Sequence, residues 1–206
     1  DWILLSFRFS TLVTLKGMVR FHLLETEPHL KLYVTPIHFH PESHPIPYSF
    51  PADEAATLAG NDGLFKTMGW AVDTWTISSD LAGEEHFAQD LKLTEDQYEK
   101  MFNSFLKEDT RLLVHVSEFT DRAAHVLWRL RDKEHPRYDP ILAAKYEGLI
   151  LDCYKRMDRM EGAARATLGP DDLLIVLSDH GFTSWRRGVN YNTWLVRNGF
   201  MTLKDE

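Results

Sequence analysis

Apolar and polar positions follow two different patterns along the chain, and the change falls near residue 110. From Trp2 to about Pro36 the apolar residues come in short runs broken at Gly17, which predicts antiparallel strands joined by turns. The segment from Pro36 to Pro51 carries five prolines, each of which fixes φ and removes a backbone hydrogen-bond donor. We therefore expect an irregular loop in this segment.

Short helices are expected after this loop. Helix-start residues at Ser49 and Pro51 predict one helix that ends at Gly60. Thr94 and Gln97 have the spacing of a capping box, which predicts the start of a second helix running to about residue 108. Residues 1–109 are thus predicted to form an α+β region.

Beyond Arg111 the sequence alternates between apolar runs and helical patterns. The runs at residues 112–116 and 173–177 predict buried strands, and the helices between them are expected to begin at Asp121 and at Asp139. Strands that are separated by helices pair in parallel. Residues 110–206 therefore predict a doubly wound α/β sheet, and the fold class of the chain is α/β.

The helices of this second region have recognisable ends. The helix that opens at Asp139 and Pro140 is expected to stop near Gly169, and a last helix over residues 191–198 should close on Gly199 before a strand at 200–203. The long helix carries an apolar stripe that predicts packing against the sheet: Tyr146, Ile150, Cys153, Tyr154, Met157 and Met160.

Composition and charge exclude several classes of protein. The net charge of −8 argues against nonspecific binding to nucleic acids, which are polyanions. A single cysteine, Cys153, excludes an internal disulfide framework and a cysteine-based zinc knuckle. No apolar run approaches the roughly 18 residues that a membrane-spanning helix requires. The chain is therefore expected to be globular, and its compartment is left open.

Candidate chemistry follows the two predicted strands, because open α/β sheets bind ligands beyond the carboxyl ends of their strands. Asp121 and His125 come after the first strand, with a spacing of four residues that puts both on one helical face. Asp179 and His180 come directly after the second strand. Carboxylate oxygens and imidazole nitrogens together suit zinc or a similar divalent ion.

Each pair also has a purely structural interpretation. Asp121 is a suitable helix N-cap, and His125 could be a partly buried helix residue beside Trp128. Asp179 and His180 could simply be polar turn residues. Because both pairs follow predicted strands of one sheet, we favour a site for two metal ions.

A second histidine cluster offers a rival metal site. His38 and His40 would share a face of an extended segment, and Glu42 and His44 lie nearby in the sequence. The surrounding prolines make a rigid surface loop the better explanation of this segment.

Three segments together resemble one enzyme family. Residues 120–129, residues 177–182 with Asp179-His180-Gly181, and residues 187–195 are similar to segments of the type I phosphodiesterase/nucleotide pyrophosphatase group of the alkaline phosphatase superfamily. The resemblance covers roughly residues 111–206. It implies that residues 110–206 are part of a metal-binding core and that residues 1–109 form a cap or insertion.

The resemblance also implies a mechanism and a ligand set. Two divalent ions, zinc or alternatively manganese, would bridge a small phosphate-ester substrate, with Asp121 and His125 on one ion and Asp179 and His180 on the other. The family's Ser or Thr nucleophile and a further metal-binding histidine are not found in this chain. We expect the chain to be a segment of a longer phosphohydrolase, and the alternative is an incomplete or degenerate fragment that serves as a structural or binding module.

Overall fold

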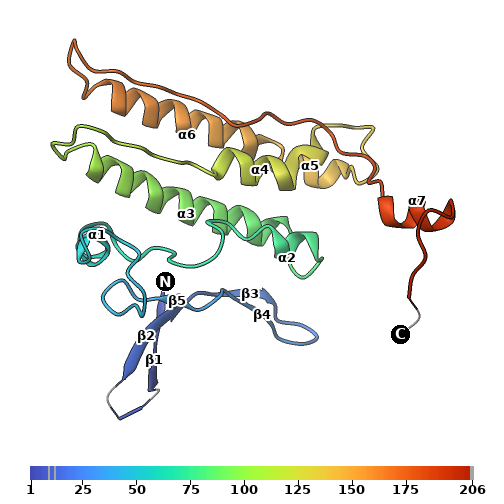
Figure 1. The fold of residues 1–206 in the computed structure, drawn as a ribbon, viewed down its shortest axis with the longest axis horizontal. Helices are drawn as coiled ribbons and strands as arrows, with labels where there is room; N and C mark the ends of the chain where they lie inside the picture. Colours follow the sequence, from blue (N-terminus) through green and yellow to red (C-terminus); the bar gives the residue numbers. More distant parts are fainter. Residues whose placement is uncertain (9, 12, 205–206) are drawn as a thin grey trace.

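The computed structural model describes residues 1–8, 10–11 and 13–204. A group of packed helices lies over two small β-sheets, and the carboxyl-terminal helix stands apart from both (Figure 1). The structure contains both helices and sheets, which confirms the general prediction of an α/β chain.

The first sheet contains β1 (Ile3–Arg8), β2 (Thr14–Val19) and β5 (His38–Phe39), in the antiparallel order β1-β2-β5. Gly17 does not break a strand, as the sequence pattern suggested, but lies inside β2 opposite Leu5 and Phe39. A Cβ atom at Gly17 would lie 2.9 Å from side-chain atoms of both Ile37 and Phe7. Glycine is therefore required by the close packing of this sheet.

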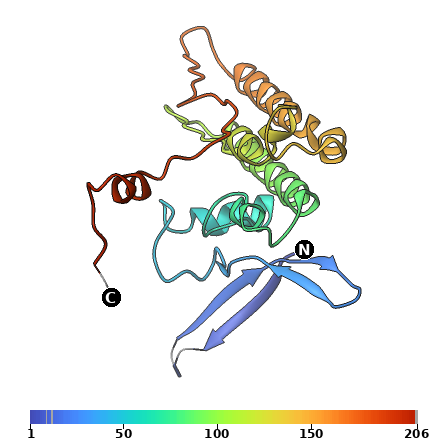
Figure 2. The same cartoon turned by 90° about the vertical axis from the view of Figure 1, so that its right-hand side faces the viewer.

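The second sheet is a hairpin of β3 (Phe21–Glu25) and β4 (Lys31–Val34). The prediction of antiparallel strands before Pro36 is thus confirmed. The proline-rich loop is irregular as expected, except that β5 adds a short third strand to the first sheet. Figure 2 shows both hairpins on one side of the helices.

The helices of the first half differ from their predicted bounds. α1 (Glu54–Asp62) ends at Gly63, which adopts a φ of 95°, and not at Gly60. A short α2 (Trp75–Ser78) is followed by α3 (Glu84–Phe105). Thr94 does not cap a helix, because α3 begins ten residues earlier and the Thr94 hydroxyl donates to the Asp90 carbonyl at 2.7 Å.

The second half contains α4 (Phe119–Leu127), the 3₁₀ helix η1 (Trp128–Leu130), α5 (Pro140–Tyr146), α6 (Gly148–Arg165) and α7 (Tyr191–Arg197). Asp139 caps α5 as predicted, since its carboxylate accepts from the backbone N–H groups of Ile141 and Leu142 at 2.8 and 3.0 Å. The predicted single long helix is divided in two at Glu147, and α6 ends at Arg165.

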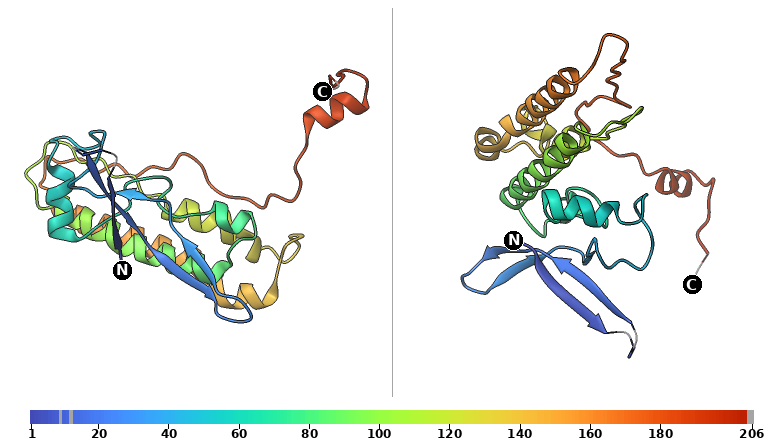
Figure 3. Two further views of the ribbon diagram at one scale, coloured as in Figure 1. Left: turned by 90° about the horizontal axis from the view of Figure 1, so that it is seen from below. Right: turned by 90° about the vertical axis from the view of Figure 1, so that its left-hand side faces the viewer.

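Both ends of α7 lie close to the predicted bounds of residues 191–198. The Asn190 side chain accepts from the backbone N–H of Thr193 at 2.9 Å, and Gly199 follows the helix with a φ of 75°. Figure 3 shows that α7 lies at the end of a long extended segment, away from the other helices.

The main core joins helices from both halves of the chain. α3 contributes Phe87 and Leu91, and α4 contributes Phe119, Ala123 and Leu127. The apolar stripe of the long helix packs against these helices and not against a sheet, with Tyr146, Ile150, Cys153 and Met160 buried. Tyr154, also predicted in the stripe, is 53% exposed. The division at residues 1–109 and 110–206 stays a prediction.

The main difference between the sequence prediction and the structure concerns the parallel strands. Within the described residues, 112–116, 173–177 and 200–203 form no strand, and the two sheets contain only β1 to β5. Apolar side chains of the first two segments face solvent, with Leu112 79% and Leu177 81% exposed. A parallel strand forms only where neighbouring strands satisfy its backbone groups and helices cover its faces. Here the two segments lie beside helices without such neighbours.

A buried ion pair links the segment between α1 and α2 to α3. Lys66 Nζ donates to both carboxylate oxygens of Asp90 at 2.7 and 2.8 Å and to the Ala71 carbonyl at 2.7 Å. Both side chains are almost completely buried. Of the helices that the structure describes, none is long and apolar enough to cross a lipid bilayer.

Candidate functional site

α4 places Asp121 and His125 on one face, as the spacing predicts. His125 Nε2 lies 3.4 Å from Asp121 Oδ1. Asp121 does not cap the helix, because α4 begins two residues before it. The next residue, Arg122, is largely buried and binds the Glu118 carboxylate at 2.8 Å and Asp121 at 3.7 Å. Its guanidinium also stacks on the ring of Trp70.

The second pair lies in the loop after residues 173–177. The His180 backbone N–H donates to Asp179 Oδ1 at 3.0 Å, and the Ser178 hydroxyl donates to the His180 carbonyl at 2.7 Å. His180 Nδ1 lies 3.0 Å from the Gly181 carbonyl oxygen. Since a carbonyl can only accept, Nδ1 carries the hydrogen, and the neutral ring leaves the lone pair of Nε2 available.

The two pairs meet at one place on the surface. His180 Nε2 lies 3.8 Å from Asp121 Oδ1 and 3.8 Å from Asp179 Oδ2. Asp121 thus stands between the imidazoles of His125 and His180. The structure brings Asp121 next to His180, although the segments before the two pairs are not paired as strands. That these four side chains bind metal stays a prediction.

Phe182 contacts both histidines, and the sequence analysis gave it no role. Its ring lies edge-on to both histidines, with centroid distances of 4.9 Å to His125 and 5.4 Å to His180. It also lies 5.8 Å from the Trp128 ring. The position of Phe182 directly after Asp179-His180-Gly181 was the available signal, because an apolar residue there can anchor a polar loop on a helix.

The carboxylates and imidazoles of these four residues are groups that bind a divalent ion. Only some of the distances between them match those in a metal site. Across residues 1–8, 10–11 and 13–204, no three His, Cys, Asp or Glu side chains form a group that could hold one metal ion. Two donors bound to one tetrahedral zinc ion lie about 3.3 Å apart. The 3.4 Å between His125 and Asp121 fits this spacing, whereas the 3.8 Å contacts of His180 are longer. Two carboxylates and two imidazoles fit zinc chemically.

The rival histidine cluster has mainly structural contacts. His38 is buried, and its Nδ1 accepts from the backbone N–H groups of Thr67 and Met68 at 3.0 and 3.1 Å. Burial, with the nearby charges of Lys66 and Arg20, lowers the pKa of His38 to about 4. His40 Nδ1 accepts from the Glu42 backbone N–H at 3.2 Å, and His44 contacts the Ile46 carbonyl at 2.8 Å.

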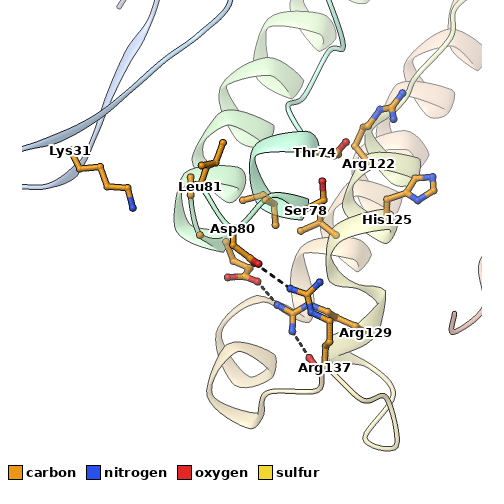
Figure 4. A pocket seen from close by; sticks show the side chains of 14 residues that line it. Lys31, Thr74, Ser78, Asp80, Leu81, Arg122, His125, Arg129 and Arg137 are labelled. Carbon is orange, nitrogen blue, oxygen red and sulfur yellow. Dashed lines mark hydrogen bonds and ion pairs between the residues drawn. The ribbon is translucent and has the colours of Figure 1, made fainter. Parts of the chain in front are cut away.

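A cavity of about 580 Å³ opens beside His125. One helical face of α4 and η1 supplies Arg122, His125, Val126 and Arg129 to its wall, and residues 74–84 supply the wall opposite α4. Figure 4 shows Lys31 across from α4, with Asp80 between them and in contact with Arg137, while the His125 ring points away from Asp80. The sequence gave no signal for this cavity, because its walls come from four distant segments.

The family assignment follows from this geometry and a comparison with known proteins. The family model described as type I phosphodiesterase / nucleotide pyrophosphatase matches residues 38–206, and the chain belongs to this family. The match begins well before residue 111, where the sequence motifs placed the start of the resemblance. The family is hydrolytic, generally metal-dependent, and acts on phosphate esters. No curated protein and no solved structure matches the chain.

Proposed function

We propose that this chain supplies metal ligands to a two-metal phosphodiesterase or nucleotide pyrophosphatase site. Asp121 and His125 would hold one divalent ion, and Asp179 and His180 would hold the other. The observation that carries the proposal is the 3.8 Å distance between Asp121 Oδ1 and His180 Nε2, which joins two segments that are remote in the sequence. Zinc is the expected metal, and manganese is the alternative.

The chain's own residues prepare the site in three ways. The Gly181 carbonyl holds the hydrogen of His180 on Nδ1, so that Nε2 stays unprotonated in the neutral ring. The Asp121 carboxylate lies next to both imidazoles and so offers an oxygen ligand beside their ring nitrogens. Phe182 fixes the two rings relative to each other. When bound, the metal ions would polarise a phosphoryl oxygen and lower the pKa of a nucleophilic hydroxyl or water.

We also propose that residues 112–116 and 173–177 are strands of an alkaline phosphatase-like doubly wound sheet in the complete enzyme. Support comes from their exposed apolar side chains, since strands of a parallel sheet are apolar on both faces. Residues 1–109 would then form a cap beside a core of residues 110–206.

The second candidate is a structural or binding module without its own activity. It is favoured by the absence, among the residues that the structure describes, of any three-residue group able to hold one metal ion. The two candidates differ in one property, which is specific binding of divalent ions at Asp121, His125, Asp179 and His180.

Calorimetric titration of the chain with zinc and with manganese tests the proposal. We expect Asp121→Asn and Asp179→Ala to weaken zinc binding by at least about tenfold, because each removes a carboxylate ligand. Asp152→Asn is the matched control, since Asp152 is exposed on α6 and pairs only weakly with Lys155 at 3.8 Å. Equal zinc affinity in all four proteins would favour the module. Hydrolysis of a chromogenic phosphodiester by the full-length protein, and its loss in Asp179→Ala, would establish the reaction.

A further inference from the structure

We propose that Arg122 is a positioning residue for Asp121, and that Trp70, in the segment between α1 and α2, holds Arg122 in place. Neither Arg122 nor Trp70 is a candidate metal ligand. The inference rests on the proposed function, because it takes Asp121 to bind a divalent ion together with His125. It adds that the first half of the chain contributes to the geometry of these ligands through one aromatic side chain.

The two carboxylate oxygens of Asp121 face different partners. Asp121 Oδ1 lies 3.4 Å from His125 Nε2 and 3.8 Å from His180 Nε2. Asp121 Oδ2 lies 3.7 Å from Arg122 Nη1. The last torsion of an aspartate side chain is broad, so a carboxylate without partners would sample many orientations. The positive charge of Arg122 attracts Oδ2 and thereby keeps Oδ1 turned toward the two imidazoles.

Arg122 lies beside Asp121 because a second carboxylate holds the other edge of its guanidinium. Consecutive residues of a helix do not face each other, so this contact needs support from elsewhere. Glu118 Oε2 accepts from Arg122 Nε at 3.1 Å and from Arg122 Nη2 at 2.8 Å. These two bonds occupy one edge of the planar group and leave Nη1 on the side of Asp121. Figure 4 shows Arg122 and His125 extending from α4 to the same side, away from Asp80.

Trp70 covers the flat face of the same guanidinium. The Arg122 Cζ atom lies 3.7 Å from the centre of the Trp70 ring, and only 10% of the Arg122 side chain is exposed. The negative face of an aromatic ring attracts a cation placed over it. Glu118 therefore fixes the guanidinium within its plane, and Trp70 fixes it across the plane. A lysine ammonium has no plane and could not keep both contacts.

The loop that carries Trp70 is anchored by its neighbours, although Trp70 itself is 64% exposed. The carbonyl of Ala71 accepts from Lys66 Nζ at 2.7 Å, and Val72 is fully buried in the main core. The backbone at Trp70 is thus held by contacts that do not involve the indole. Replacing the indole should remove the stack on Arg122 and leave the loop in place.

Calorimetric zinc titration of Trp70 variants tests the inference. Trp70→Ala should weaken the zinc binding that depends on Asp121 by about two- to fivefold, which is the contribution of one cation–π contact at an exposed site. Trp70→Phe keeps an aromatic face over the guanidinium and should recover most of the affinity. Trp75→Ala is the matched control, because Trp75 is 68% exposed at the start of α2, and it should leave zinc affinity unchanged.

Two further measurements concern the guanidinium itself. Arg122→Lys keeps the positive charge beside Asp121 but loses the planar group, and should weaken zinc binding by about tenfold. In the zinc-free chain, the rotation of the Arg122 guanidinium about its Nε–Cζ bond can be measured by ¹⁵N exchange spectroscopy. This rotation should be faster in Trp70→Ala than in the unmodified chain and in Trp75→Ala. An unchanged rate would show that Trp70 does not hold Arg122.

The outcomes separate this inference from the proposed function. Zinc binding that is lost in Asp121→Asn but unchanged in either Trp70→Ala or Arg122→Lys would overturn the positioning role and leave the metal site standing. A loss in Trp70→Ala that Trp70→Phe does not recover, or that Trp75→Ala reproduces, would overturn it as well. Zinc binding that does not depend on Asp121 would contradict the proposed function, and the positioning role would fail with it.

Discussion

The carboxylate of Asp121 and the imidazole of His180 lie 3.8 Å apart, although one belongs to α4 and the other to the loop after residues 173–177. α4 is held in the core by Phe119, Ala123 and Leu127, so the position of Asp121 is fixed by packing. The position of His180 depends on a loop that is mostly exposed. The arrangement therefore depends on the few contacts that hold this loop on α4.

Phe182 is the contact most easily tested. Phe182→Ala should weaken zinc binding by about tenfold, because the ring orients both His125 and His180 without being a ligand itself. Phe182→Leu keeps most of the apolar volume and should have a smaller effect. Phe200→Ala is the control, since Phe200 follows α7 in the sequence and its side chain is 72% exposed. Unchanged affinity in Phe182→Ala would remove this positioning role.

The stability of α4 should depend on Leu127, which is fully buried in the main core. Leu127→Ala leaves a cavity and should lower the free energy of unfolding by about 2–5 kcal/mol in urea denaturation. Leu93→Ala on α3 removes the same atoms from a side chain that is 52% exposed, and should cost much less. Equal losses in the two variants would show that α4 is not packed as described.

The buried pair of Lys66 and Asp90 predicts a non-additive result. Lys66→Met leaves the Asp90 carboxylate buried without its cation and should cost about 3–5 kcal/mol of unfolding free energy. Combining it with Asp90→Leu removes the uncompensated charge, so the double variant should be more stable than Lys66→Met alone. Additive losses, measured by urea denaturation of both singles and the double, would contradict a tight ion pair.

His38 should make stability depend on pH. Burial lowers its pKa to about 4 in the folded chain, against about 6.5 when unfolded. Between these values the unfolded chain binds a proton that the folded chain does not, so stability falls as the pH is lowered through this window. The loss attributable to His38 should reach up to about 3 kcal/mol below pH 4.

His38→Asn provides the control for this pH dependence. The asparagine carbonyl can accept from the backbone N–H groups of Thr67 and Met68 as Nδ1 does, but it does not titrate. Urea denaturation at a series of pH values should give a flatter profile for this variant between pH 6.5 and 4. Identical slopes in the two proteins would assign the pH dependence to other groups.

Local signals in the sequence predicted helix ends where they depend only on nearby residues. Asp139 accepts hydrogen bonds from the first turn of α5, and Gly199 follows the end of α7. The capping prediction at Thr94 was wrong because it also used nearby residues alone. The spacing of Thr94 and Gln97 fits a cap, but core contacts extend α3 back to Glu84. Tertiary packing overrides a local preference there.

The candidate site was predictable in part. The four-residue spacing of Asp121 and His125 on a helix determines their proximity. Their meeting with Asp179 and His180 was expected from strands of one sheet, whereas in the structure the segments before them form no strand and Phe182 contacts both histidines. The cavity was not predictable, since Lys31, Asp80 and Arg137 are brought to His125 only by the fold.

Long-range ¹H–¹⁵N spectra of the histidine rings during a zinc titration test the central claim most directly. We predict that the Nε2 resonances of His125 and His180 shift together as zinc is added, and that both shifts are abolished in Asp121→Asn. The account is contradicted if zinc moves only other histidines, such as His40 and His44, or leaves the rings of His125 and His180 unchanged.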